Sequence, residues 1–285
     1  SMTGNDPAKI ISLPNTTGMK NEVIIQRMHR NMYDPCLRYA GIKYVEIGTK
    51  NHTFTWELEA AINEKTAAVA YFVYDPQPGV LPLEDVIKIA HKHGVPVIVD
   101  AAAELPPPEN LKKFSDMGAD LVAFSGGKQI RGPNDTGILC GKKDLIETVR
   151  LHAFPAYFGD RVVIGRPMKV SKEQIVGLVV ALQRYLVKDH KVEMKKWTRM
   201  AEYMAKELDA LPHVKAEVGT LDKLRPPVII KALLTLDEKS LGMTIEEIAE
   251  KLKDGEPSII IYPEPAKGMI CLNPQCLRRG HEKIV

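Results

Sequence analysis

The first half of the chain alternates short apolar runs with segments whose apolar residues recur at helical spacing. Most of the runs are apolar at successive positions, so both faces of each predicted strand are apolar. Strands of this kind are typical of a parallel sheet that helices cover on both sides. The predicted strands are residues 22–26, 43–48, 67–74, 96–102, 121–127 and 137–141.

Two segments between these strands predict helices. They cover residues 55–66 and 82–94, and Pro82 opens the second of them while Gly94 closes it. Strands that alternate with helices are the pattern of a layered α/β domain. We therefore expect residues 1–170 to form one large α/β domain with a mainly parallel sheet.

The pattern changes near residue 170. Residues 171–211 have helical periodicity, begin at Ser171 as an N-cap, and are long enough for more than one helix. Beyond Val214, shorter apolar runs surround one predicted helix near residues 244–255. We expect connecting helices over 171–211 and a small α+β domain over 212–285.

Composition and charge place the chain among ordinary folded proteins. Hydrophobic residues make up 45% and charged residues 26% of its 285 positions, which is close to globular averages. The net charge is +3, and lysine and arginine are spread along the chain, so nothing in the charge pattern demands a nucleic acid or a membrane. No apolar run reaches membrane-spanning length, and no charged-then-apolar leader is visible.

The four cysteines favour a reducing compartment. They form no C-x-x-C pair, and a chain of this length needs no disulfide framework, so the cytoplasm is the expected location. Cys271, Cys276 and His281 lie close in sequence but lack a fourth partner at ligand spacing. We expect incidental thiols and no metal site.

Polar residues with chemical potential follow two consecutive predicted strands. Asp100 ends one apolar run, and Ser125 and Lys128 end the next, in the stretch "AFSGGKQIRGP". Consecutive strands of an open parallel sheet tend to be neighbours, and ligands bind at their carboxyl ends. Asp100 and Lys128 are therefore expected to face one pocket.

Two interpretations of this pair remain open from the residues alone. A carboxylate and an amine in one crevice can form an ordinary ion pair. Alternatively, Gly126 and Gly127 leave room for a flat ligand beside a partly desolvated, nucleophilic lysine. A nearby aspartate suits pyridoxal phosphate, whose ring nitrogen must stay protonated for the ring to act as an electron sink.

Three blocks carry a family resemblance: "VIVDAAAELPPPENL", "GADLVAFSGGKQIRGPNDTGILCG" and "IGRPMKVSKEQIVGL". They resemble the selenocysteine synthase-like branch of fold type I pyridoxal phosphate enzymes, and especially the D-glucosaminate-6-phosphate ammonia-lyase-like proteins. The resemblance implies that Lys128 forms the Schiff base with the cofactor and that Asp100 contacts the pyridine nitrogen. It also implies that Ser125 lies near the phosphate and that Ala102 packs against the ring. Without a cofactor, Ser125 would cap a turn and Ala102 would be a core residue.

The start of the chain departs from this family pattern. Members of the branch carry an upstream segment with a small-residue turn whose amides hold the cofactor phosphate. Here the chain opens at "SMTGNDPAKI", which resembles the stretch after that segment. We expect either that the sequence is a fragment lacking the N-terminal segment or that the cofactor is held differently.

Two arginines are candidates for reading the substrate. Arg131 stands where selenocysteine synthases resemble "KLLGGP", so a cation here could bind a carboxylate or phosphate. Arg166, in "IGRPMKV", is the other candidate, and its alternative is a structural ion pair. Further candidates in matching segments are His29, Asn51 and Glu104, whereas His91 and His93 are expected at the surface.

The function implied by the resemblance is a pyridoxal phosphate-dependent β-elimination. It would convert an amino sugar acid phosphate, D-glucosaminate 6-phosphate, into a 2-keto-3-deoxy acid phosphate and ammonia. The alternatives are a selenium transferase acting on seryl-tRNA, which would need a basic face, and a non-catalytic homologue. The resemblance also implies a homo-oligomer, a dimer or larger, with a small anionic substrate.

Overall fold

The computed structural model describes residues 2–73, 78–220, 229–264 and 268–285. The chain divides into two compact units, Ser1–Lys188 and Asp189–Val285. This boundary falls inside the segment 171–211 that was predicted to connect two domains. The structure assigns the first long helix of that segment to the first unit and the second to the other unit.

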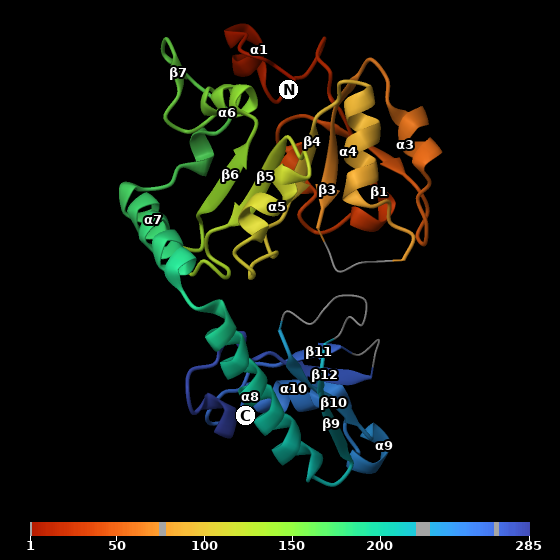
Figure 1. Ribbon diagram of the computed structural model, residues 1–285, viewed down its shortest axis with the longest axis vertical. Coiled ribbons are helices and arrows are strands. Elements are labelled where there is room, and N and C mark those ends of the chain that lie inside the picture. The colour runs from red at the N-terminus through yellow and green to blue at the C-terminus, as the bar shows by residue number, and fades with distance from the viewer. Residues whose placement is uncertain (1, 74–77, 221–228, 265–267) are drawn as a thin grey trace. The chain divides into compact units, whose positions relative to one another are not determined.

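The first unit contains a six-stranded sheet with the order β2-β1-β3-β4-β5-β6 (Figure 1). All neighbouring strands are parallel except β6, which runs antiparallel to β5. The six predicted strands are therefore present in the predicted order along the chain. Their bounds are β1 Glu22–Gln26, β2 Lys43–Ile47, β3 Thr66–Phe72, β4 Val97–Asp100, β5 Leu121–Ser125 and β6 Gly137–Gly141.

Helices cover one face of this sheet and build the main core. They are α3 (Thr55–Ala61), α4 (Leu83–Lys92), α5 (Asn110–Asp116) and α7 (Lys172–Val187). Apolar residues of α4 recur at helical spacing, at positions 83, 86, 87 and 90, and all four are buried. This spacing is why residues 82–94 could be predicted as a helix from the sequence.

The opposite face of β4 and β5 is less covered. Val97, Val99 and Val122 are fully buried in the core, whereas their strand neighbours on the other face are only partly buried. Asp100 and Ser125 belong to this partly covered face, because side chains alternate along a strand. The expectation that these strands are buried on both faces was therefore only partly right.

One predicted helix is shorter than expected. Residues 55–66 were predicted to be helical, but α3 ends at Ala61 and β3 begins at Thr66. Asn63 makes the turn, since its Oδ1 accepts a hydrogen bond from the amide of Lys65 at 2.7 Å. The remaining elements of this unit are α1 Pro7–Ser12, η1 Arg27–His29, α2 Pro35–Arg38, α6 Lys143–Arg150, β7 Tyr157–Phe158, β8 Arg161–Val162 and η2 Arg166–Met168.

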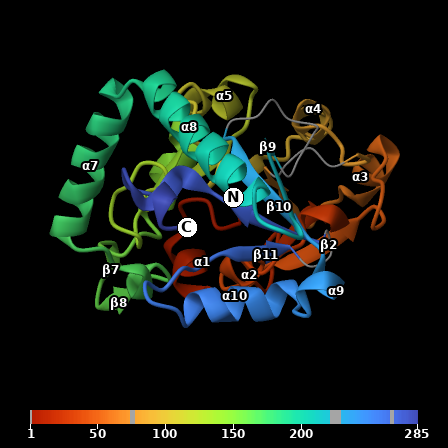
Figure 2. The same cartoon turned by 90° about the horizontal axis from the view of Figure 1, so that it is seen from below.

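The second unit is a small α+β fold, as the shorter apolar runs predicted. Its sheet has the order β11-β12-β10-β9, all antiparallel, and α8 packs against β9 and β10 (Figure 2). Met204, Ile245 and Ile270 join helices and sheet in one core. The elements are α8 His190–Asp209, β9 Val214–Gly219, β10 Lys231–Leu236, α9 Glu238–Leu241, α10 Ile245–Lys253, β11 Tyr262–Glu264, β12 Met269–Leu272, η4 Pro274–Cys276 and η5 His281–Lys283.

Two further features concern possible metal ligands and possible membrane-spanning helices. Cys271 is buried in β12 and Cys276 is exposed, and the part of the chain that the structure describes holds no cluster of three metal-ligating side chains. Among the same residues, no helix combines the length and the apolar character that crossing a membrane requires.

A buried carboxylate ties the amino-terminal edge of the sheet together. Asp120, whose side chain is 4% exposed, accepts hydrogen bonds from Val97 N at 2.7 Å, His91 Nε2 at 2.8 Å and Lys142 Nζ at 2.6 Å. Burial alone would raise the pKa of Asp120, but the bonds from Lys142, His91 and Val97 outweigh it and hold the pKa below its ordinary value. The ionised form is thus the one that stabilises the fold.

Asp120→Asn should lower the free energy of unfolding by about 2 kcal/mol at neutral pH, because two charge-assisted hydrogen bonds are lost. A lowered carboxyl pKa contributes stability above the ordinary value of 3.8 and loses it as the pH falls through the lower pKa of the folded state. The gap between wild type and variant, measured by urea denaturation, should therefore be constant at neutral pH and shrink below pH 3.8. Asp116→Asn, at an exposed position of α5, is the matched control and should change nothing.

Candidate active site

The structure places Asp100 and Lys128 on neighbouring strands at the same edge of the sheet. Asp100 is the last residue of β4 and pairs with Ala123 of β5 in a parallel ladder. Lys128 follows three residues after Ser125, the last residue of β5. The expected adjacency of the two strand ends is therefore present.

The carboxylate of Asp100 is oriented but not neutralised. Its Oδ1 accepts a hydrogen bond from the amide of Ala102 at 2.9 Å, which fixes the side chain beyond the strand end. Within the described ranges, no cation lies within ion-pair distance of Asp100, and no carboxylate lies within that distance of Lys128. The structure thus shows no ion pair between them, and both charges remain available to a ligand.

Lys128 is exposed, which corrects the expectation of a partly desolvated lysine. The two glycines before it also have a different reason from the one expected. A Cβ on Gly126 would lie 2.2 Å from Thr136 Oγ1, and one on Gly127 would lie 2.5 Å from Asn134 Cα. The glycines therefore make room for the chain's own return segment, rather than for a flat ligand.

Residues 126–136, here called the Lys128 loop, form a closed ring of backbone contacts. Gly126 N donates to Thr136 O at 2.9 Å, and Gly132 N donates to Gly126 O at 2.8 Å. A further bond runs from Arg131 N to Lys128 O at 3.0 Å. Thr136 Oγ1 also donates to Pro133 O at 2.6 Å. The chain that presents Lys128 is thus held by its own backbone.

Arg131 occupies an unusual backbone conformation. Its φ is 61°, in the left-handed region that favours glycine. Selenocysteine synthases resemble "KLLGGP" here, with glycine at the matching position. Strained positions of this kind cluster where a side chain is used in function. The observed angle therefore adds a physical argument for a role of the Arg131 side chain.

Arg166 lies in η2, outside the Lys128 loop. One of its guanidinium nitrogens donates to Phe154 O at 3.4 Å, and the guanidinium carbon lies 5.8 Å from the centroid of the Tyr157 ring. The residues that the structure describes include no carboxylate paired with it. The structural ion pair considered for Arg166 is therefore absent from the described part, but no contact links it to Lys128.

Helix α7 supports the Lys128 loop through residues that the sequence did not single out. Gln174 Nε2 donates to Asp135 Oδ2, and Leu178 fills the space beside Gly126. Gly177 lets Pro133 approach the helix, since a Cβ there would lie 3.1 Å from the proline ring. The spacing Ser-x-x-Gln at the start of α7 was a visible capping signal, but its link to Asp135 is tertiary.

His29 is buried at the carboxyl end of β1, in η1. Its ring meets Tyr71 edge-on, with 4.6 Å between centroids and an interplanar angle of 80°. Burial lowers the pKa of His29 to about 4, so the imidazole is neutral near pH 7. The sequence identified this residue only through its matching segment.

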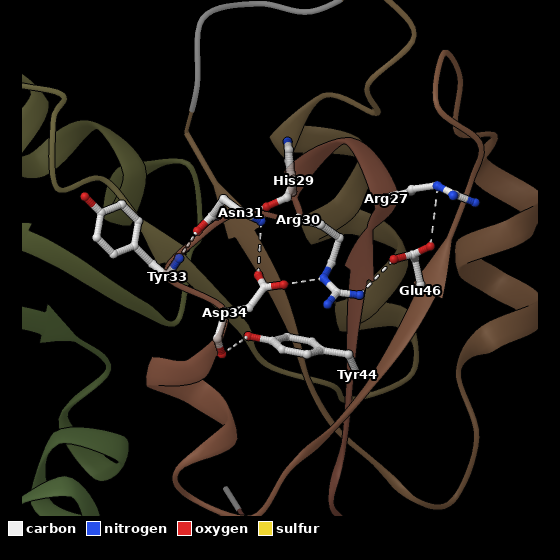
Figure 3. A network of polar contacts seen from close by, with 8 residues as sticks. All are labelled: Arg27, His29, Arg30, Asn31, Tyr33, Asp34, Tyr44 and Glu46. Atoms are coloured by element: carbon white, nitrogen blue, oxygen red, sulfur yellow. Dashed lines mark hydrogen bonds and ion pairs between the residues drawn. The ribbon is translucent and has the colours of Figure 1, made fainter.

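A polar network fixes the chain around His29 (Figure 3). Asp34 accepts bonds from Arg30 Nε at 2.5 Å and from Asn31 N at 3.2 Å. Asn31 Nδ2 in turn donates to His29 O at 3.0 Å. Arg30 also reaches Glu46 at 2.8 Å, so the network joins η1 to β2. The turn after β1 is therefore tied to β2 by polar contacts at the same sheet edge as Asp100.

The remaining candidates from the sequence lie at positions that give little support for a functional role. Asn51 is exposed beyond β2, and its amide donates to Thr49 Oγ1 at 3.2 Å. Glu104 lies beyond β4, where its carbonyl accepts from Asn110 Nδ2 at 2.6 Å. His91 and His93 are exposed, as expected, although each lies beside a carboxylate.

The comparison with protein families agrees with this geometry. The family model described as Aminotransferase class-V matches residues 10–249. The chain belongs to the aminotransferase class-V family. Its predicted fold class, a mainly parallel α/β domain of fold type I with a small α+β unit, is confirmed.

One member of the family is similar over the whole chain in both sequence and structure. A D-glucosaminate-6-phosphate ammonia lyase of Salmonella typhimurium is 30% identical over 294 residues, which cover 100% of this chain and 74% of that protein. The solved structure of a D-glucosaminate-6-phosphate ammonia-lyase superposes with a TM-score of 0.81 at 30% identity, covering 99% of this chain and 73% of the other.

Two further relatives have other activities. A 5'-C-glycyluridine monooxygenase-decarboxylase of Streptomyces sp is 33% identical over 296 residues, covering 100% of this chain and 70% of that protein. An L-seryl-tRNA(Sec) selenium transferase of Aquifex aeolicus is 26% identical over 300 residues, covering 91% of this chain and 62% of that protein. Similarity within the family is thus broader than one reaction.

Proposed function

We propose that the protein is a pyridoxal phosphate-dependent ammonia-lyase that acts on an amino sugar acid phosphate, with D-glucosaminate 6-phosphate as the substrate. The observation that carries the proposal is the pair of unneutralised charges, Asp100 and Lys128, on adjacent strand ends of a class-V fold. Support for the substrate comes from the relative of that name, which is 30% identical over the whole chain.

The donor set suits the cofactor. Asp100 has one carboxylate oxygen held by Ala102 N, which leaves the other for the protonated pyridine nitrogen. Lys128 supplies an exposed amine one strand away. Ser125 lies on the same sheet face as Asp100 and would contact the cofactor near its phosphate, while the half-buried Ala102 would pack against the ring.

The bound cofactor supplies an electron sink for the carbanion at the substrate α-carbon. Lys128 would hold the cofactor through its amine and, as a general base, would take the proton from the substrate α-carbon. Asp100 would keep the ring nitrogen of the bound cofactor protonated, because a carboxylate beside it favours the charged form. The 3-hydroxyl would leave as water with the proton held by Lys128, and addition of water to the released product would give a 2-keto-3-deoxy acid phosphate and ammonia.

Two arginines would bind the anionic substrate. Arg131, three residues after Lys128, is the candidate for the phosphate, because a guanidinium binds such a group bidentately. The partly buried Arg166 makes no ion pair among the described residues, so its charge remains for a carboxylate.

The test is a direct assay of the purified protein with pyridoxal phosphate. Ammonia and a 2-oxo acid should appear in equal amounts from D-glucosaminate 6-phosphate, and a visible absorbance band should mark the bound cofactor. Absence of this band in the full-length protein would contradict any catalytic function. A band without ammonia release would contradict the lyase.

Each alternative function predicts a different experimental outcome. The selenium transferase requires salt-sensitive binding of seryl-tRNA, and it is the less favoured because that relative is less similar and the net charge is only +3. The 33% identity with the Streptomyces protein favours a second candidate, an amino acid that carries a uridine. Consumption of 5'-C-glycyluridine instead of the sugar acid would identify that reaction, and a protein without cofactor binding would be a non-catalytic homologue.

The proposed function also implies an oligomeric state and a cellular compartment. We expect a homo-oligomer, a dimer or larger, because the related fold type I enzymes complete their sites across subunits. We also expect the protein to lie in the cytoplasm. The free cysteines agree with a reducing compartment. A sedimentation experiment on the full-length protein measures the oligomeric state.

A further inference from the structure

We propose that Asp135 and Gln174 are positioning residues that set the affinity for the anionic substrate, by holding the Lys128 loop against α7. This inference rests on the proposed function, in which Lys128 and Arg131 act on the substrate. Neither Asp135 nor Gln174 is expected to touch the substrate itself. Their effect would pass through the conformation of Arg131.

The contact joins two segments far apart in sequence. Gln174 Nε2 donates a hydrogen bond to Asp135 Oδ2, across 39 residues of chain. Apolar contacts continue the same junction, because Leu178 Cδ1 would lie 2.7 Å from a Cβ on Gly126 and 3.3 Å from one on Gly132. The outgoing and returning ends of the Lys128 loop are thus both packed on α7.

Arg131 needs this support because its backbone is strained. A non-glycine residue in the left-handed region is strained and persists only where the surroundings fix it. Two backbone bonds, from Arg131 N to Lys128 O and from Gly132 N to Gly126 O, close the tip of the loop. The position of this tip therefore depends on the returning segment of the loop, which contains Asp135.

The Asp135 contact is poorly suited to a purely stabilising role. Asp135 is exposed, and an exposed polar contact contributes little to the stability of the fold. Its removal should therefore leave the fold intact. A change in substrate affinity would come from loss of preorganisation, since small misplacements of a binding group are costly.

Gln174 has a second role that must be separated from this one. Its Oε1 accepts a hydrogen bond from Ser171 N at 2.5 Å, while Ser171 Oγ accepts one from Gln174 N at 3.2 Å, as a capping box. Ser171→Ala removes the cap oxygen but leaves the Gln174–Asp135 bond. Asp135→Ala removes that bond but leaves the cap, so the two variants separate loop positioning from helix capping.

The first readout needs no activity. Asp135→Ala should raise the amide hydrogen-exchange rate of residues 126–132 about tenfold, because the loop opens more often. Asp135→Asn keeps an acceptor for Gln174 and should restore the wild-type rate. Ser171→Ala should speed exchange at the start of α7 only, and Gln183→Ala, at an exposed position of the same helix, should change neither segment.

The second readout is steady-state kinetics with D-glucosaminate 6-phosphate. Asp135→Ala should raise KM about tenfold with kcat within about threefold, while Asp135→Asn, Ser171→Ala and Gln183→Ala keep the wild-type KM. Unchanged exchange in Asp135→Ala would overturn the inference, as would an equal rise of KM in the two helix controls. If the wild type released no ammonia, the proposed function would fail. The exchange experiment would still decide whether the contact between Asp135 and Gln174 holds the Lys128 loop.

Discussion

Lys128→Ala should abolish the visible absorbance of bound pyridoxal phosphate and reduce ammonia release about 10³-fold or more. The physical reason is that, in the proposed mechanism, one amine both holds the cofactor covalently and moves the α-proton. Lys128 is exposed and lies within ion-pair distance of no described carboxylate, so the free energy of unfolding should stay unchanged. Absorbance spectra, an ammonia assay and urea denaturation of the same preparation measure these three quantities.

The matched control for this variant is Lys112→Ala. Lys112 is also exposed, in α5, and it makes no ion pair among the residues that the structure describes. It should keep the absorbance band and full activity. Residual activity of Lys128→Ala near the wild-type level would show that the lysine is only a surface charge, and the proposed mechanism would then be wrong.

Arg131→Gly should raise KM for D-glucosaminate 6-phosphate about 100-fold while leaving the stability of the fold within about 1 kcal/mol of wild type. In the proposed function Arg131 makes charge-assisted bonds to the phosphate, and their removal would lower the affinity. The small effect on stability follows from the φ of 61°, since glycine relieves the left-handed strain while adding freedom to the unfolded chain. Steady-state kinetics and thermal denaturation of the holoenzyme measure the two effects.

A substrate comparison makes this experiment specific. D-glucosaminate without the phosphate should react equally slowly with wild type and Arg131→Gly, because the lost contact is to the phosphate. Arg184→Ala, at an exposed position of α7, should retain the wild-type KM for both compounds. An equal loss toward phosphorylated and unphosphorylated substrate would assign Arg131 to another group of the substrate and would contradict its phosphate role.

The candidate pair Asp100 and Lys128 could be found from the sequence because the signal is local. Each follows a short apolar run, and parallel neighbours end at one edge, so strand order alone brings β4 and β5 together. The reason for Gly126 and Gly127 could not be found in this way. Their space is taken by Thr136 and Asn134, and this contact exists only once the chain has turned back.

The division between local signals and tertiary contacts is clearer at the residues that surround the candidate site. Ser171 was recognised as a cap because the capping pattern is short, yet nothing in it indicates that Gln174 also reaches Asp135. Likewise, the sequence contains His29 in a matching segment, but its burial against Tyr71 depends on the pairing of β1 with β3. Both contacts join segments that are separated by more than thirty residues.

Local patterning was therefore sufficient to predict the α/β class and the strand ends, and to single out Lys128 as a candidate, because apolar periodicity and strand termini are properties of short segments. Tertiary structure alone decided that Lys128 is exposed and that Arg131 has a left-handed backbone. It also decided that α7 supports the loop carrying both residues. These features arise from close contacts between distant segments, and such contacts depend on how the whole sheet and its covering helices pack.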